Sequence, residues 1–129
     1  MPNVAFISPK GGAGKTTAAV ALALGLVERG HRVALIDSDP NKPLVRWAEL
    51  PNRCREISVH PAPTVPDIRD AAREAQRRSP DWMILDTEGT ERGTAVLAAL
   101  RLDVVLTPLA GSVLDLRETV KAAEIVHMF

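Results

Sequence analysis

Short apolar runs alternate along this chain with longer amphipathic segments, and this alternation limits most strongly how the chain can fold. Four of the five runs are continuous stretches of Val, Ile, Leu, Ala and Phe, the pattern of strands buried on both faces of a mostly parallel sheet. We therefore predict an α/β fold with helices on both faces of the sheet. The predicted strands are Asn3–Ser8, Arg32–Asp37, Glu56–His60, Trp82–Asp86 and Asp103–Thr107.

The predicted helices lie between and after these strands. They are Lys15–Arg29, a short helix near Leu44–Leu50, Asp67–Arg78, Gly93–Arg101 and Val113–Met128. The strand Glu56–His60 alternates polar and apolar residues, so we expect it at an edge of the sheet. The last strand, Asp103–Thr107, is apolar in its middle and would form an open edge that pairs with other chains. We therefore expect low stability or self-association of the 129-residue chain.

The length and composition of the chain limit the classes of protein to which it can belong. The 129 residues suffice for one compact domain, which we predict to be a partial one over residues 1–129. Lys plus Arg is 16 and Asp plus Glu is 16, so no global field attracts nucleic acid or an anionic membrane. The single cysteine, Cys54, cannot form an internal disulfide or a cysteine metal cage. The N-terminal residues do not read as a leader or a membrane span, so we expect a cytoplasmic protein.

A glycine-rich segment, residues 9–17 (P-K-G-G-A-G-K-T-T), lies between the first predicted strand and the first predicted helix. Glycines there let backbone N–H groups surround phosphate oxygens, and the N-terminus of the helix adds partial positive charge. Lys15 would contact the β- and γ-phosphates, and Thr16 would place its hydroxyl on Mg²⁺. Pro9 stands where the ordinary phosphate loop has its first glycine, and Lys10 adds a second cation.

Carboxylates stand at the ends of two predicted strands. Asp37 ends the second strand, Asp39 follows it, and Asp86 ends the fourth strand. Because the carboxyl ends of parallel strands meet at one crevice, we expect these side chains near the glycine-rich segment. Asp86 would hold Mg²⁺ through its water shell. For Asp37 and Asp39 the alternative is a helix cap before Pro43.

The stretch K-G-G-A-G-K-T-T at residues 10–17 resembles the deviant Walker A motif of ParA/MinD-type ATPases. Asp37-Ser38-Asp39-Pro40 is similar to the D-x-D-P stretch of partition ATPases, and the resemblance extends through residues 103–108. The chain is most similar to small ParA (ParF-like) plasmid partition ATPases, which have no N-terminal DNA-binding module. Members of that group continue beyond this point, so the chain looks C-terminally truncated.

The resemblance implies ATP and Mg²⁺ as cofactors and assigns roles to individual residues. The implied nucleotide-binding residues are Lys10, Gly11, Gly12, Ala13, Gly14, Lys15, Thr16 and Thr17, and the implied metal contacts are Thr16, Asp37 and Asp86. The implied catalytic residues are Lys10, Lys15 and Asp39. Lys10 would reach the partner's phosphates across a nucleotide-sandwich dimer, and Asp39 would orient the attacking water.

The implied function is plasmid or chromosome partition by an ATPase that switches between monomer and ATP-bound homodimer. Its partners would be a ParB-like centromere-binding protein and non-specific DNA, with association with the nucleoid and none with a membrane. Two alternatives remain: a non-hydrolysing remnant that acts as an interaction module, and a P-loop metabolic synthetase. The sequence does not show whether the bound nucleotide would be ATP or GTP.

One further motif is a basic ridge on the predicted helix Asp67–Arg78. Arg69, Arg73 and Arg77 lie four residues apart, with Arg78 beside them. They would either contact phosphates or form a solvated face paired with acidic residues of the same helix.

Overall fold

The computed structural model describes residues 1–9, 11–51, 54–109 and 111–128. In this part of the chain five strands form one sheet in the order β3-β2-β4-β1-β5. The strands are β1 (Asn3–Phe6), β2 (Val33–Asp37), β3 (Ile57–Pro61), β4 (Trp82–Asp86) and β5 (Val104–Leu106). Every pairing within this sheet is parallel.

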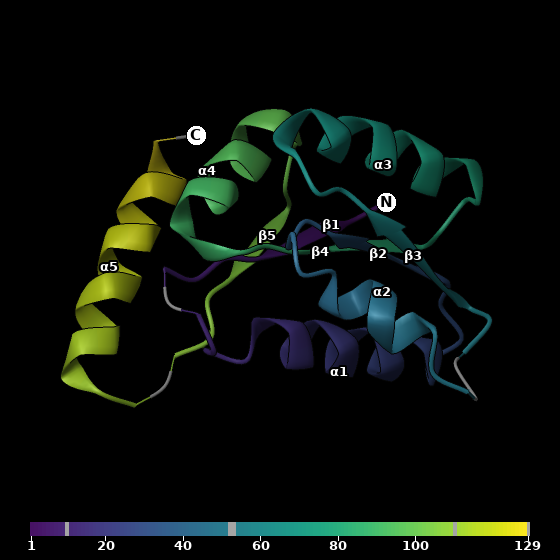
Figure 1. Cartoon of the computed structure of the whole chain (residues 1–129), viewed down its shortest axis with the longest axis horizontal. Helices are drawn as coiled ribbons and strands as arrows, with labels where there is room; N and C mark the ends of the chain where they lie inside the picture. Colours follow the sequence, from purple (N-terminus) through teal and green to yellow (C-terminus); the bar gives the residue numbers. More distant parts are fainter. Residues whose placement is uncertain (10, 52–53, 110, 129) are drawn as a thin grey trace.

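Five helices accompany the described strands: α1 (Lys15–Val27), α2 (Pro43–Ala48), α3 (Val65–Arg77), α4 (Gly89–Ala99) and α5 (Val113–His127). Figure 1 shows α1 and α2 on one face of the sheet, α3 and α4 on the other, and α5 beyond the β5 side. The predicted α/β class, with helices on both faces, is confirmed. None of the helices in the described ranges is long and apolar enough to cross a bilayer.

Alternate residues of the central strands supply the two cores. In β2, Val33 and Leu35 belong to the core under α1 and α2, whereas Ala34 and Ile36 belong to the core under α3 and α4. All five residues of β2 are buried. This burial explains why the apolar runs are continuous, since a strand covered on both faces has no solvent-facing positions to fill with polar residues.

Two helices begin earlier than the sequence predicted. α3 begins at Val65 because Thr64 and Asp67 form a reciprocal capping box, with a proline in the first turn. The sequence had predicted the start of this helix at Asp67, two residues later. α4 begins at Gly89 because the chain turns into helix directly after β4, four residues before the predicted start at Gly93.

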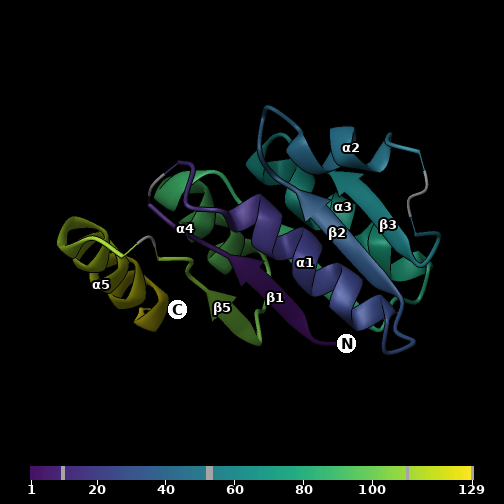
Figure 2. The same ribbon diagram turned by 90° about the horizontal axis from the view of Figure 1, so that it is seen from below.

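The two ends of the sheet differ in how they are covered. β3 lies at one end, as predicted, and packs against α3. β5 lies at the other end, where Figure 2 shows α5 beyond the edge of the sheet, and α5 contacts α4. Most of the exposed large apolar side chains of the described residues gather on this side: Val104, Leu106, Leu109, Val113, Leu114, Leu116, Val120 and Met128. We call this set the β5–α5 apolar face.

Candidate functional site

The glycine-rich loop joins β1 to α1, as predicted. Gly12 and Gly14 have φ angles of 75° and 85°, and a side chain at either position would meet no atom within 4 Å. The glycines are therefore required by the left-handed backbone and not by lack of space. The carbonyl of Gly14 accepts the first helical hydrogen bond from the Ala18 amide at 2.9 Å. Lys10, predicted to contact phosphate and act in catalysis, lies outside the described residues.

The N-terminus of α1 is built to receive an anion. Its N-cap is Gly14, and no side-chain hydrogen bond or acidic first-turn residue caps this end within the described chain. The backbone N–H groups and the positive end of the helix dipole therefore face the loop. Lys15, the first residue of α1, is only 8% exposed.

A cavity of about 440 Å³ lies over this loop. It is lined by Gly11, Gly12, Ala13, Gly14, Lys15, Thr16, Thr17, Asp39, Asn41 and Glu88. The structure thus brings the described loop residues together with Asp39, one of the predicted strand-end carboxylates. Asn41 and Glu88 complete the lining from the segments that follow β2 and β4. We call this space the loop cavity.

Asp86, the last residue of β4, is 1% exposed. Its Oδ2 accepts a hydrogen bond from the Thr16 hydroxyl, whereas its buried Oδ1 has no hydrogen-bond partner among the described residues. Burial raises the pKa of Asp86 to about 6, against the lowering effect of the Thr16 hydrogen bond. A buried carboxylate oxygen without a donor, next to a hydroxyl, is a pair of hard oxygen ligands that suits a divalent cation.

Asp37 is placed differently. Its carboxylate is fully buried, and its Oδ2 accepts hydrogen bonds from the amides of Leu44 and Val45 at 2.9 and 3.0 Å. Its Oδ1 accepts a hydrogen bond from the Asp39 amide at 3.2 Å. Burial raises the pKa of Asp37, while these backbone donors lower it. The side chain therefore caps α2, the alternative that the sequence left open, and its predicted contact with a metal remains a prediction.

The segment after Asp37 is folded around Asp39. The Oδ1 of Asp39 accepts a hydrogen bond from the Asn41 amide at 2.8 Å, and its carbonyl accepts one from Lys42 at 2.9 Å. These bonds form a turn that holds the half-buried Asp39 side chain at the loop cavity. Through the Asp37 bonds, the position of this turn depends on α2.

Two hydroxyl residues that sequence reasoning missed hold the strand ends together. Ser38 donates to the carbonyl of Asp86 from its amide at 3.0 Å and from its Oγ at 2.9 Å. Thr87 donates from its Oγ1 to the Phe6 carbonyl at 2.8 Å. These bonds join the ends of β2, β4 and β1 beside the loop. The available sequence signal was a small hydroxyl residue directly after each strand-end aspartate.

No group of three or more His, Cys, Asp or Glu side chains within the described ranges could hold a metal ion. A cation near Asp86 would therefore have few protein ligands, here the Asp86 Oδ1 and the Thr16 hydroxyl. Mg²⁺ sites beside phosphates commonly have this composition, with substrate oxygens and water completing the octahedron. The Asp86 Oδ1 and the Thr16 hydroxyl are therefore suitable ligands for Mg²⁺.

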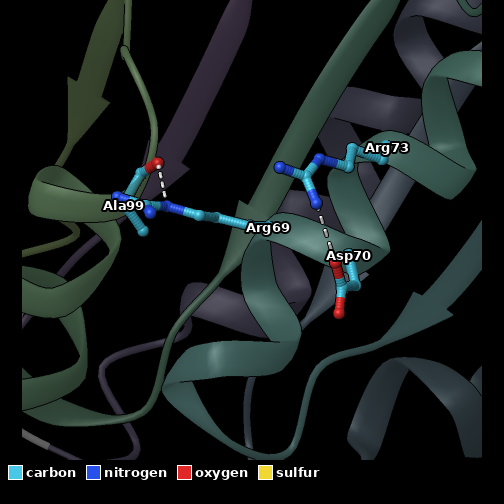
Figure 3. A network of polar contacts seen from close by, with 4 residues as sticks. All are labelled: Arg69, Asp70, Arg73 and Ala99. Carbon is cyan, nitrogen blue, oxygen red and sulfur yellow. Dashed lines mark hydrogen bonds and ion pairs between the residues drawn. The ribbon is translucent and has the colours of Figure 1, made fainter.

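The basic ridge on α3 is largely paired. Arg73 lies 3.2 Å from the Asp70 carboxylate and Arg77 lies 2.9 Å from the Glu74 carboxylate. Figure 3 shows Arg69 reaching across to α4, where its Nε donates to the Ala99 carbonyl at 3.2 Å. These contacts agree with the solvated, paired face that was one of the two predicted alternatives.

A parallel sheet in this strand order, with a glycine loop between β1 and α1 and acidic strand ends beside it, defines a P-loop NTPase fold. The VirC1 protein family model matches residues 1–128. The chain therefore belongs to the VirC1 protein family.

Individual relatives support this assignment. The chain is 37% identical over 121 residues to the protein virC1 of Rhizobium radiobacter, covering 84% of this chain and 51% of that protein. It is 33% identical over 122 residues to the protein ParA of Rhizobium radiobacter, with 89% and 51% covered. The chain spans about half the length of these curated relatives.

A solved structure shows the same fold. An ATP complex of McdA from Cyanothece superposes with a TM-score of 0.72 at 17% identity, covering 99% of this chain and 64% of that one.

Proposed function

We propose that this chain binds ATP together with Mg²⁺ in the loop cavity and acts as a partition ATPase of the ParA type. The observation that supports this most directly is the arrangement of Asp86, whose buried carboxylate is hydrogen-bonded to Thr16 of the loop and keeps one oxygen without a donor. The proposal also draws on the virC1 and ParA relatives, which give the expected class of activity.

The described loop residues would bind the phosphates. Gly11 to Gly14 present backbone N–H groups, and Lys15 contributes a cation at the β- and γ-phosphates. Thr16 and Asp86 would hold Mg²⁺, which neutralises charge on the phosphate oxygens when it is bound. The role of Thr17 in binding and the contact of Asp37 with the metal belong to this same proposal.

Hydrolysis would depend on two further residues. Asp39, held by its turn at the edge of the loop cavity, would orient the attacking water. Lys10 would act across an ATP-bound homodimer, offsetting charge that develops on the partner's phosphates. In the cell this cycle would act with a ParB-like centromere-binding protein and with non-specific DNA on the nucleoid.

The test is nucleotide affinity, measured by calorimetry with ATP and with GTP in the presence of Mg²⁺. Lys15→Ala should abolish binding, whereas the matched control Lys121→Ala, an exposed lysine on α5, should leave it unchanged. ATP should bind more tightly than GTP. Equal affinities for ATP in the wild type and Lys15→Ala would refute the site.

Two variants test the catalytic roles separately from binding. Asp39→Ala should bind ATP but hydrolyse it slowly and accumulate as a dimer. Lys10→Ala should keep the monomer's ATP affinity while losing turnover. If either variant lost affinity as Lys15→Ala does, its assigned role in hydrolysis would be wrong.

A further inference from the structure

A second cavity lies at the outer edge of the sheet, away from the loop cavity. It has a volume of about 390 Å³. Its polar lining comes from β3 and the segment just before it and from the C-terminal end of α3 with its cap residue: Arg55, Ser58, His60, Glu74 and Arg78. A smaller cavity of about 110 Å³ adjoins it, sharing Arg55, Ser58 and Arg78 and adding Arg32. Figure 2 shows β3 at the side of the sheet opposite α5. We call the larger space the edge cavity.

Among the described residues that line the edge cavity, the two arginines Arg55 and Arg78 outnumber the one carboxylate, Glu74. Arg32 lies 3.9 Å from the Asp81 carboxylate, but Arg55 and Arg78 form no ion pair or hydrogen bond through their side chains within the described chain. Glu74 also lines the cavity, and its carboxylate is 2.9 Å from Arg77. Guanidinium groups that share one cavity repel each other, so this arrangement favours binding of an anion.

Two neutral hydrogen-bonding groups line the same cavity. His60 is 8% exposed, and its Nε2 lies 2.9 Å from the Ser58 Oγ. Burial and the nearby Arg78 lower the pKa of His60, while Glu74 raises it. The lowered pKa favours the neutral imidazole, and the His60–Ser58 pair can donate a hydrogen bond to an oxyanion.

We propose that the edge cavity binds the terminal phosphate of a small phosphomonoester, held by the guanidinium groups of Arg55 and Arg78 and by hydrogen bonds from Ser58 and His60. The planar fork of a guanidinium matches phosphate oxygens bidentately. The cavity volume lies in the range of small-molecule sites.

A continuous polyanion fits this surface less well than a single phosphate. Glu56 lines the adjoining cavity, Glu74 lines the edge cavity itself, and Asp81 stands beside Arg32. These carboxylates would repel the successive phosphates of a nucleic acid backbone. The proposed ligand is therefore compact, with its charge concentrated in one group.

The test is an NMR titration of the full chain with glycerol 2-phosphate as the phosphomonoester probe. The His60 ring and the Ser58 and Val59 amides report on the edge cavity, and the Gly12 and Gly14 amides report on the loop cavity. We expect saturable shifts at the edge-cavity signals and a rise in the pKa of His60, because a bound dianion stabilises the imidazolium.

Variants assign the binding to these residues. Arg55→Gln with Arg78→Gln should weaken the affinity read at His60 by at least about tenfold, the equivalent of about 1.4 kcal/mol. The matched control Arg73→Gln removes an exposed arginine of α3 that is paired with Asp70, and this variant should leave the affinity unchanged. Lys15→Ala should remove the loop-cavity shifts and retain those at His60, so failure of the proposed function is distinguishable from failure of this site.

Three results would overturn the proposal. The first is a titration that shifts only Gly12 and Gly14. The second is equal affinity at His60 in the wild type and the double arginine variant. The third is a short DNA duplex that shifts the edge-cavity signals when the phosphomonoester does not, since that would make the surface a nucleic acid contact.

Discussion

The buried carboxylate of Asp86 should make the metal-free chain less stable as the pH rises. Its pKa in the folded chain is about 6, against an ordinary value of 3.8, because burial penalises the charged form. The folded state therefore binds the proton more tightly than the unfolded state does. The stability that the protonated group contributes is complete below pH 3.8 and is lost as the pH rises through about 6.

The magnitude follows from that difference in pKa. A pKa difference of about two units corresponds to a change of at most about 3 kcal/mol in the free energy of unfolding. Asp86→Asn preserves the shape of the side chain and keeps an oxygen to accept the Thr16 hydrogen bond, but it carries no charge. Between pH 4 and pH 7.5 the stability of this variant relative to the wild type should rise by up to about 3 kcal/mol, because only the wild type loses stability on ionisation of residue 86.

The assay is urea denaturation with EDTA present, at pH 4, 5.5 and 7.5, comparing the two proteins at each pH. Asp37 also has a raised pKa, so the quantity to follow is the difference between variant and wild type, from which the contribution of Asp37 cancels except for its electrostatic interaction with Asp86. Asp70→Asn, an exposed carboxylate paired with Arg73, is the control and should show a difference below about 1 kcal/mol at every pH. A difference for Asp86→Asn that stays constant from pH 4 to 7.5 would refute the reasoning.

Three further variants test the packing of α4, the cap of α2 and self-association through the β5–α5 apolar face. Gly93→Ala should destabilise the fold by about 1–3 kcal/mol in urea, because the new Cβ would clash with the buried side chain of Ile7, whereas Gly25→Ala, at an ordinary contact distance, should not. Asp37→Ala should speed hydrogen exchange of the two α2 amides bonded to it by at least about tenfold, since it removes their acceptor; unchanged exchange would contradict the cap. Leu114→Lys, on the β5–α5 apolar face, should reduce self-association measured by light scattering, and a monomeric wild type would disprove that expectation.

The alternation of apolar and amphipathic segments was enough to predict the sheet and its helices. The reason is physical: β2 and β4 are covered on both faces, so their sequences carry no polar interruptions. The same reasoning located the carboxyl ends of the strands. Asp86 and Asp39 were therefore predicted beside the glycine loop, where the structure places them.

The role of Asp37 could not be read from the sequence, because a carboxylate after a buried strand serves equally as a metal ligand and as a helix cap. The choice depends on how the chain turns after Asp39, which brings the start of α2 back over Asp37. The edge cavity could not be predicted from the sequence either, since Arg55 precedes β3 and Arg78 follows α3, and both line one cavity only because α3 packs on β3. The start of α3 was missed because the predicted helix began at Asp67, whereas Pro66 lies in its first turn and the Thr64–Asp67 capping box starts the helix before it.

The most direct test of the proposed function is a crystal structure of the chain with Mg²⁺ and a non-hydrolysable ATP analogue. The account predicts that the triphosphate lies along the Gly11–Thr17 loop, with Mg²⁺ held by the Thr16 hydroxyl and by Asp86, either directly or through the water shell of the ion. A triphosphate bound elsewhere, or an Asp86 carboxylate that contacts neither the ion nor its water shell, would contradict the account.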